Sequence, residues 1–336
     1  MKIGIVGAGA MGLLLGQRFH AAGQDVSLLD LPHRVAQLKT TDTITLIGLD
    51  GSEALLPTSL LTSDYFAVGL QEVVILATKA QDLPAVAKFI PMLTNGRSPV
   101  VGVQNGIPWW YLHGTSNQSA PSPLQCLDPE GLLHRYIQSS QILGCVAYPA
   151  AMTDTEGRVL HVEGNSFPVG ELDGTTTERA LQIAGLFQSA GFRSRVIADI
   201  RSEIWLKLLG AASINPVSAL TRMSMRDVCT FPPTQALVRT MMEEARDIAE
   251  ALGITFRLSI DKRLEGARQV GAHKTSMLQD VENHRPLELD ALMLAVLELG
   301  ELTGKPAPTI RTVYACAALL NAGLQGVVSQ PQDATA

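Results

Sequence analysis

Short apolar runs alternate with amphipathic stretches through the first third of the chain. Ile3, Ile5 and Val6 have the pattern of a buried strand, and helical spacing follows from Met11 to about Ala22. Further strands are predicted at 25–29, 43–47, 72–77 and 99–103, and helical segments at 34–39 and 82–93. This alternation predicts an α/β fold with a doubly wound parallel sheet.

The pattern changes twice after the first third. Periodicity is lost over 108–138, where Trp109-Trp110-Tyr111 precedes a stretch rich in serine and proline. Such a long excursion can act as a lid, a buried anchor or a subunit contact. Strands are then expected at 141–147, 158–171 and 193–197, and helices at 175–190, 200–212, 233–252, 257–270, 287–303 and 309–322. We therefore expect a sheet domain over 1–198, which includes the excursion, and an all-helical substrate and catalytic domain over 199–330.

A glycine-rich turn joins the first strand to its helix, with the spacing G-x-G-x-x-G. Gly7 permits a tight turn, Gly9 lets the backbone approach a pyrophosphate, and Gly12 lets the helix pack closely on the strand. Ala8, Ala10 and Met11 complete the loop, whose helix start would hold the phosphates. The next strand ends in Asp30. We predict a dinucleotide site here, against the alternative of a tight turn that binds no nucleotide.

The overall composition narrows the class of ligand. The chain has 336 residues, a formal net charge of −6 and no block of basic residues, which argues against a nucleic-acid or anionic-membrane partner. Its four cysteines are scattered, so no metal site or disulfide framework is indicated. Because the first strand begins at residue 2, we expect no signal peptide and a cytoplasmic protein that binds a small molecule. The apolar final helices could pack within the chain or against a second subunit, so a homodimer is possible on the sequence alone.

Lys207 is the cation within an apolar helical run that starts at Ile204. Burial would lower its pKa towards neutrality and suit it to general acid catalysis, although a lysine whose ammonium reaches water is an equal alternative. Asn215 lies eight residues later and shares its face if the helix continues, but Pro216 is expected to end that helix. Asn215 is then either a substrate ligand or a helix cap.

Two later polar residues have a structural interpretation and a functional one. Ser276 has capping-box spacing to Gln279, which predicts a helix N-cap. Glu288 follows Pro286 at the start of an amphipathic helix, where the helix dipole favours a carboxylate. Two further polar clusters, Thr78-Lys79 and Gln104-Asn105-Gly106, follow predicted parallel strands at the edge where such sheets bind ligands.

Together these segments resemble the ketopantoate (2-dehydropantoate) reductase family over nearly the whole chain. The resemblance rests on five ordered matches: the glycine loop at 7–12, Thr78-Lys79-Ala80, Gln104-Asn105-Gly106, the run from Glu203 through Lys207 to Asn215-Pro216, and Ser276-Met277-Leu278-Gln279-Asp280 followed by Glu288. It implies a Rossmann domain, a helical domain, and NAD(P)H-dependent reduction of a 2-oxo acid, namely 2-dehydropantoate to pantoate in pantothenate biosynthesis.

The resemblance also assigns roles to individual residues. Lys207 is implied as the general acid, Ser276 as the ligand of the substrate carboxylate, and Glu288 as the ligand of the substrate hydroxyl. Asn215 is implied as a further substrate ligand, and Lys79 and Asn105 are implied to line the nicotinamide end of the site. Ala211, Met225 and His273 stand where the family commonly has asparagine, which favours a less hydroxylated 2-oxo acid.

The sequence leaves the coenzyme and the exact reaction open. Family habit implies NADP(H), whereas Asp30 would accept hydrogen bonds from an unmodified ribose and repel a 2′-phosphate, which favours NAD(H). Arg34 is a candidate phosphate ligand. One alternative function is an NAD-dependent D-2-hydroxyacid dehydrogenase on the same fold. A 3-hydroxyacid dehydrogenase is disfavoured by Ala211, and a non-catalytic dinucleotide sensor is the alternative from another class.

Overall fold

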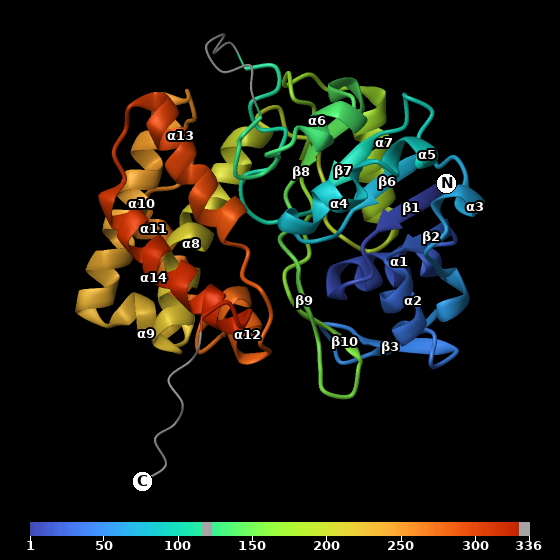
Figure 1. Ribbon diagram of the computed structural model, residues 1–336, viewed down its shortest axis with the longest axis horizontal. Coiled ribbons are helices and arrows are strands. Elements are labelled where there is room, and N and C mark those ends of the chain that lie inside the picture. The colour runs from blue at the N-terminus through green and yellow to red at the C-terminus, as the bar shows by residue number, and fades with distance from the viewer. Residues whose placement is uncertain (116–122, 329–336) are drawn as a thin grey trace. The chain divides into compact units, whose positions relative to one another are not determined.

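A computed structural model of the chain describes residues 1–115 and 123–328 (Figure 1). The chain forms two compact units, and both contain segments from more than one part of the sequence. Unit 1 comprises Met1–Gln104, Pro108–Pro123 and Asp128–Ile200. Unit 2 comprises Asn105–Ile107, Leu124–Leu127 and the chain from Arg201 onward.

Unit 1 is built on a seven-stranded sheet with the spatial order β11-β8-β7-β6-β1-β2-β5. Its neighbours are parallel except for the antiparallel pair β8 and β11. The strands are β1 (Lys2–Val6), β2 (Asp25–Leu29), β5 (Leu61–Thr62), β6 (Val73–Leu76), β7 (Val100–Gly102), β8 (Ile142–Cys145) and β11 (Val169–Gly170). The chain runs outwards from β1 in one direction and from β6 in the other, so the carboxyl ends of these two strands mark the switch point where such sheets bind ligands.

Helices α1 (Ala10–Ala21) and α7 (Glu178–Ser189) supply much of the apolar core of unit 1. Phe19 of α1 lies 5.5 Å, centroid to centroid, from Phe187 of α7, which stacks at 4.5 Å on Phe167. Shorter helices complete the unit: α2 (Pro32–Leu38), α3 (Tyr65–Val68), α4 (Leu83–Ala87), α5 (Ile90–Leu93) and α6 (Leu132–Tyr136). The single helix expected at 82–93 is split into α4 and α5. Pro91 lacks the N–H that a continuous helix would need there, whereas Pro84 lies in the first turn of α4, where this N–H is not required.

A second sheet of four strands packs against α1, with the order β4-β3-β10-β9. The strands are β3 (Thr43–Ile47), β4 (Glu53–Pro57), β9 (Ala150–Thr153) and β10 (Val159–Glu163). The prediction of a strand at 193–197 was wrong. This segment makes only isolated β-bridges, from Arg193 to Ser166 and from Val196 to Val169. Its neighbour β11 is two residues long and offers too short a ladder for a full strand.

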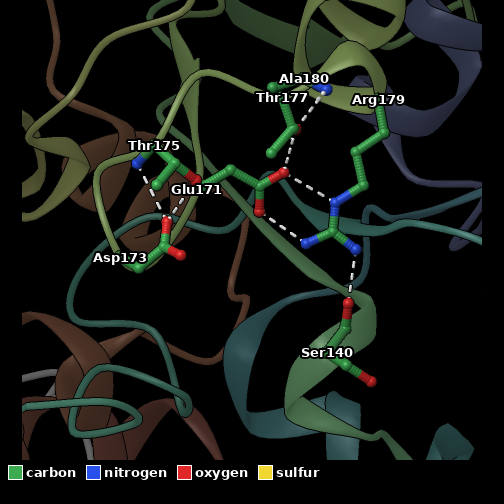
Figure 2. A network of polar contacts seen from close by, with 7 residues as sticks. All are labelled: Ser140, Glu171, Asp173, Thr175, Thr177, Arg179 and Ala180. Carbon is green, nitrogen blue, oxygen red and sulfur yellow. Dashed lines mark hydrogen bonds and ion pairs between the residues drawn. The ribbon is translucent and has the colours of Figure 1, made fainter.

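The loop between β11 and α7 is fixed by a polar network (Figure 2). Arg179 donates to both oxygens of the buried Glu171, at 2.7 and 2.5 Å, and also to the carbonyl of Ser140. Thr177 donates to the same carboxylate and caps α7 by accepting from Ala180 N–H at 3.2 Å. The network ties the start of α7 to the 3-10 turn η3 (Ser139–Gln141), just before β8.

The aromatic triplet of the excursion is buried. Trp109, Trp110 and Tyr111 are at most 5% exposed. A Cβ placed on Gly144 of β8 would lie 3.1 Å from the Trp110 ring, so this tryptophan packs on the sheet of unit 1. Among the alternatives for the triplet, burial supports a loop anchor over a lid. The serine- and proline-rich stretch of the excursion falls largely outside the described residues.

Unit 2 is helical in its described part, which confirms the predicted fold class of a largely parallel sheet followed by helices. It contains α8 (Ile200–Thr221), α9 (Met225–Thr230), α10 (Pro232–Ala251), α11 (Ile260–Val270), α12 (Ser276–Glu282), the π-helical turn η4 (Asp290–Leu294), α13 (Ala295–Thr303) and α14 (Pro308–Leu324). The expectation that Pro216 ends its helix was wrong, because α8 continues five residues beyond it. Pro216 and the three residues after it are buried, so the helix continues through packing of this segment despite the missing N–H.

Candidate active site

The glycine loop after β1 forms a tight strand-to-helix turn, in which neighbouring backbone atoms leave no room for a side chain at two of the glycines. Gly7 has a φ of +108°, and a Cβ there would lie 2.5 Å from the backbone nitrogen of Thr78. A Cβ on Gly12 would lie 1.8 Å from the carbonyl oxygen of Gly7. Both positions therefore require glycine for the turn and for the close approach of α1, as the sequence predicted.

Gly9 differs from the other two glycines, because a Cβ there would meet nothing within 4 Å. Gly9 is the exposed N-cap of α1, no side chain caps this helix, and its first turn contains no acidic residue. The N–H groups that begin the helix at Ala10 and Met11 thus point to a partly exposed, uncapped end. Helix starts of this kind bind phosphate. The residues fit a dinucleotide pyrophosphate.

The end of β6 adds a polar atom beside the glycine loop. Thr78 follows β6, and its hydroxyl oxygen is buried with no hydrogen-bond partner among the described residues. The side-chain amide of Gln104 donates to the carbonyls of Leu76 and Thr78, at 2.7 and 3.1 Å, and so fixes the backbone where β6 ends. A buried hydroxyl without a partner is costly, which is consistent with a ligand group at this edge of the sheet. Lys79 follows directly, half-buried.

Asp30 is positioned at the end of β2 by two main-chain donors. Its carboxylate accepts from Ala8 N–H at 2.6 Å and from Leu31 N–H at 2.7 Å. The guanidinium of Arg34 also reaches this loop and donates to the Ala8 carbonyl at 3.4 Å. Burial, together with the charge of Asp30, raises the pKa of Tyr65 to about 12. A carboxylate and a guanidinium therefore both contact the backbone of Ala8 in the glycine loop.

Two of the predicted site residues, Lys207 and Asn215, lie on one narrow accessible stripe of helix α8. From Glu203 to Ala219 the helix is buried except at Lys207, Ala211 and Asn215, which are partly exposed. These three follow one another at intervals of four residues, so they lie on one face, and Lys207 and Asn215 are about 12 Å apart along the axis. Because α8 continues past Pro216, the condition for Lys207 and Asn215 to share a face is met.

Lys207 has a defined partner. Its ammonium donates to the side-chain oxygen of Asn105 at 2.6 Å. One turn before Lys207, the buried carboxylate of Glu203 accepts from Arg257 at 2.9 and 3.0 Å, which anchors the start of α8 to the chain before α11. The structure thus brings Lys207 and Asn105 together within unit 2. The resemblance had placed these residues in the same site, but it did not imply a direct contact between them.

The remaining predicted substrate residues lie on other elements of unit 2. The N-cap of α12 is Thr275, whose hydroxyl accepts from Leu278 N–H at 3.2 Å, so the prediction of Ser276 as N-cap was wrong by one residue. This leaves Ser276 exposed in the first turn of α12. Glu288 is partly exposed immediately before the helical segment that contains η4. Met225 N–H donates to the carbonyl of His273 at 3.0 Å, so two of the three positions at which the resemblance leads us to expect asparagine are in contact.

Two family models match the chain. Residues 3–174 match the model described as ketopantoate reductase PanE/ApbA, and residues 199–321 match its C-terminal counterpart. The chain belongs to the ketopantoate reductase family. A 2-dehydropantoate 2-reductase from Mesorhizobium japonicum is 43% identical over 94% of this chain and 96% of its own length. No helix among the described residues is both long and apolar enough to cross a membrane.

Solved structures agree with the family assignment. A structure from Ralstonia solanacearum MolK2, assigned to the ketopantoate reductases, is 36% identical and has a TM-score of 0.89, covering 97% of this chain and 98% of that one. A D-mandelate dehydrogenase in complex with NADH and anilino(oxo)acetate has a TM-score of 0.81 at 21% identity, covering 97% of this chain and 100% of that one. The second likeness is one of fold.

Proposed function

We propose that this protein is an NAD(P)H-dependent oxidoreductase of the 2-dehydropantoate 2-reductase type, which reduces a 2-oxo acid to a 2-hydroxy acid, with Lys207 as the general acid. The role of Lys207 is supported by one observation. Lys207 lies on the accessible stripe of the otherwise buried helix α8, and its ammonium is hydrogen-bonded to Asn105. Membership of the ketopantoate reductase family supports 2-dehydropantoate as the substrate.

Unit 1 supplies the dinucleotide site in this proposal. The backbone from Gly7 to Gly12, including Ala8, Ala10 and Met11, holds the pyrophosphate, and Asp30 contacts the adenosine ribose. Lys79 lines the site where β6 ends. When bound, the reduced nicotinamide supplies the hydride that the 2-oxo carbon accepts.

Lys207 acts at the substrate oxygen. As negative charge develops on the carbonyl oxygen, the ammonium stabilises it and donates a proton. An ammonium has three N–H donors, and the bond to Asn105 uses one of them, which restricts the direction of the others. Asn215 and Ser276 orient the substrate, Ser276 at its carboxylate, and Glu288 accepts from its hydroxyl group.

The test compares two lysine variants in unit 2. Purified protein is assayed with 2-dehydropantoate and NADPH or NADH by loss of absorbance from the reduced coenzyme. Lys207→Ala should lower kcat by about 100- to 10,000-fold while coenzyme Kd stays unchanged. The control is Lys262→Ala, at an exposed lysine on α11, which should retain parental kcat. Absence of coenzyme oxidation by the parent would reject the activity, and an active Lys207→Ala variant would reject the role of the lysine.

The coenzyme preference is set in our proposal by two side chains that act in opposite directions at Ala8. Asp30 disfavours a 2′-phosphate by charge, and Arg34 favours it. Asp30→Asn should raise the ratio of kcat/KM for NADPH over NADH, and Arg34→Gln should lower it, each by about 10-fold, which corresponds to ~1.4 kcal/mol. If neither substitution changes this ratio, the 2′ position lies elsewhere.

One observation favours a second candidate, an NAD-dependent D-2-hydroxyacid dehydrogenase. Ala211 lies between Lys207 and Asn215 on the accessible stripe and places an apolar group there. A panel of branched and aromatic 2-oxo acids, compared with 2-dehydropantoate by kcat/KM, discriminates between the two reactions. A non-catalytic sensor would instead bind coenzyme without turnover of any 2-oxo acid.

A homodimer and a cytoplasmic location remain predictions.

A further inference from the structure

The π-helical turn η4 leaves one of its carbonyls available to a distant loop. Ala295 N–H donates to the carbonyl of Asp290, five residues back, where an α-helix would use Ala291, four residues back. The Ala291 carbonyl instead accepts from Ile107 N–H at 2.8 Å. Ala291 and Ile107 are each 1% exposed, so this bond is shielded from water.

The residue before Ile107 allows the loop to approach this closely. Gly106 has a φ of +86°, a conformation that disfavours any residue with a Cβ. A Cβ at Gly106 would also lie 2.4 Å from the Ala291 oxygen and 2.5 Å from its carbonyl carbon. Both atoms belong to the backbone and cannot rotate away. Gly106 therefore meets two independent requirements of the contact with η4.

The same loop carries the partner of Lys207. Asn105 directly precedes Gly106, and its side-chain oxygen accepts from the Lys207 ammonium at 2.6 Å. Glu288 is on the other side of the contact, three residues before Ala291, and its carbonyl accepts from Leu292 N–H at 3.3 Å. Residues 105–107 and η4 all belong to unit 2.

We propose that Gly106, Ile107 and the Ala291 carbonyl of η4 form a dock that positions Lys207 by holding Asn105 against its ammonium. The inference rests on the proposed function, in which Lys207 is the proton donor. Gly106, Ile107 and Ala291 act as positioning residues. Loss of the dock leaves Lys207 in place but releases the acceptor that directs its ammonium, so the rate of the chemical step falls while coenzyme binding is retained.

The test uses two Gly→Ala variants with nearly the same backbone strain. Gly106→Ala is compared with Gly253→Ala, since Gly253 has a φ of +84° and its added Cβ would meet nothing within 4 Å. Gly106→Ala should lower kcat by about 10- to 100-fold, the effect of losing a hydrogen bond to a charged group, with coenzyme KM within about twofold of the parent. Gly253→Ala should retain parental kcat and lose only stability.

Two further readouts separate positioning from general damage. If Gly106 acts through Asn105, the double variant of Gly106→Ala with Asn105→Ala should be no slower than Asn105→Ala alone. The basic limb of the pH profile of kcat should move to lower pH in both single variants, because an acceptor that favours the charged ammonium is lost. Additive losses, or an unchanged pH profile, would overturn the proposal.

A structural readout keeps the inference testable apart from the activity. In a crystal structure of Gly106→Ala the side-chain oxygen of Asn105 should lie more than 3.5 Å from the Lys207 nitrogen, whether or not the parent turns over 2-dehydropantoate. A retained 2.6 Å contact would reject the dock, whereas an inactive parent would reject the proposed function alone. If Gly106→Ala does not fold, Ile107→Pro takes its place. It removes the N–H that donates to the Ala291 carbonyl, and its kcat, pH profile and crystal structure are compared with those of the parent in the same way.

Discussion

Gly9→Ala separates the folding role of the glycine loop from its proposed role in binding. Gly9 has φ −76° and ψ −177°, which alanine adopts without strain, and an added Cβ would meet no atom within 4 Å. The substitution should therefore leave the free protein as stable as the parent, or raise its free energy of unfolding by about 0.4–1 kcal/mol through the unfolded state. In our proposal this open space is filled by the pyrophosphate.

The expected loss of binding follows from the same geometry. A methyl group at Gly9 would push the phosphates off the N–H groups at the start of α1, and losing one charge-assisted hydrogen bond costs about 1.5–3 kcal/mol. That cost corresponds to a coenzyme Kd about 10- to 160-fold higher than that of the parent. Isothermal titration with NADH and with NADPH measures this change, and urea unfolding without coenzyme measures stability.

Gly12→Ala is the matched opposite of Gly9→Ala. Its Cβ would lie 1.8 Å from the Gly7 carbonyl oxygen, so it should destabilise the free protein by about 1–3 kcal/mol or more, even without coenzyme. Gly9 has no separate binding role if Gly9→Ala binds both coenzymes as tightly as the parent, or if the free Gly9→Ala protein is as unstable as Gly12→Ala.

The remaining predictions concern stability and substrate affinity. Burial opposes ionisation of Glu171, but the hydrogen bonds of Figure 2 outweigh it and lower its pKa. Glu171→Gln should therefore lower the free energy of unfolding by about 2 kcal/mol at pH 7. The difference in stability between parent and variant should shrink as the pH falls below about 4.3, the unfolded-state pKa, and through the lower folded-state pKa. Urea titrations at several pH values measure this difference. A difference independent of pH would contradict this. Thr275→Ala should cost about 1 kcal/mol of stability as a lost N-cap, whereas Ser276→Ala should change stability by less than about 0.5 kcal/mol and raise KM for the 2-oxo acid. Equal destabilisation by both substitutions would contradict the assignment of Thr275 as the cap.

The parts of the fold that depend on nearby residues could be predicted from the sequence. The first strand, the glycine turn and α1 follow from apolar spacing and from glycine positions within a dozen residues, and they appear as expected. The prediction failed at Pro216, because local preference for a helix end competes with burial along α8, and only the tertiary structure determines which effect is larger. Thr275 and Ser276 are adjacent hydroxyl residues with almost equal capping preference, so spacing alone could not separate them.

The partner of Lys207 depended on contacts that no local pattern contains. Asn105 could be recognised as polar and placed at a strand end, but its bond to Lys207 joins segments about a hundred residues apart in the chain. The π-helical turn at Asp290 was also not predicted, because its irregular hydrogen bonding is matched to the Ile107 N–H of another segment. Such pairs are determined by tertiary packing rather than by periodicity.

The interleaving of the two units along the chain limits how the protein can be divided. Cutting after Ile200 would give a carboxyl-terminal fragment that lacks residues 105–107 and 124–127, although both segments pack with its helices. That fragment would contain Lys207 but not Asn105, and the Ala291 carbonyl would lose its donor. Recombination with a single crossover therefore cannot transfer an intact helical half to another dinucleotide-binding protein. Transfer would require the two short insertions to move with it.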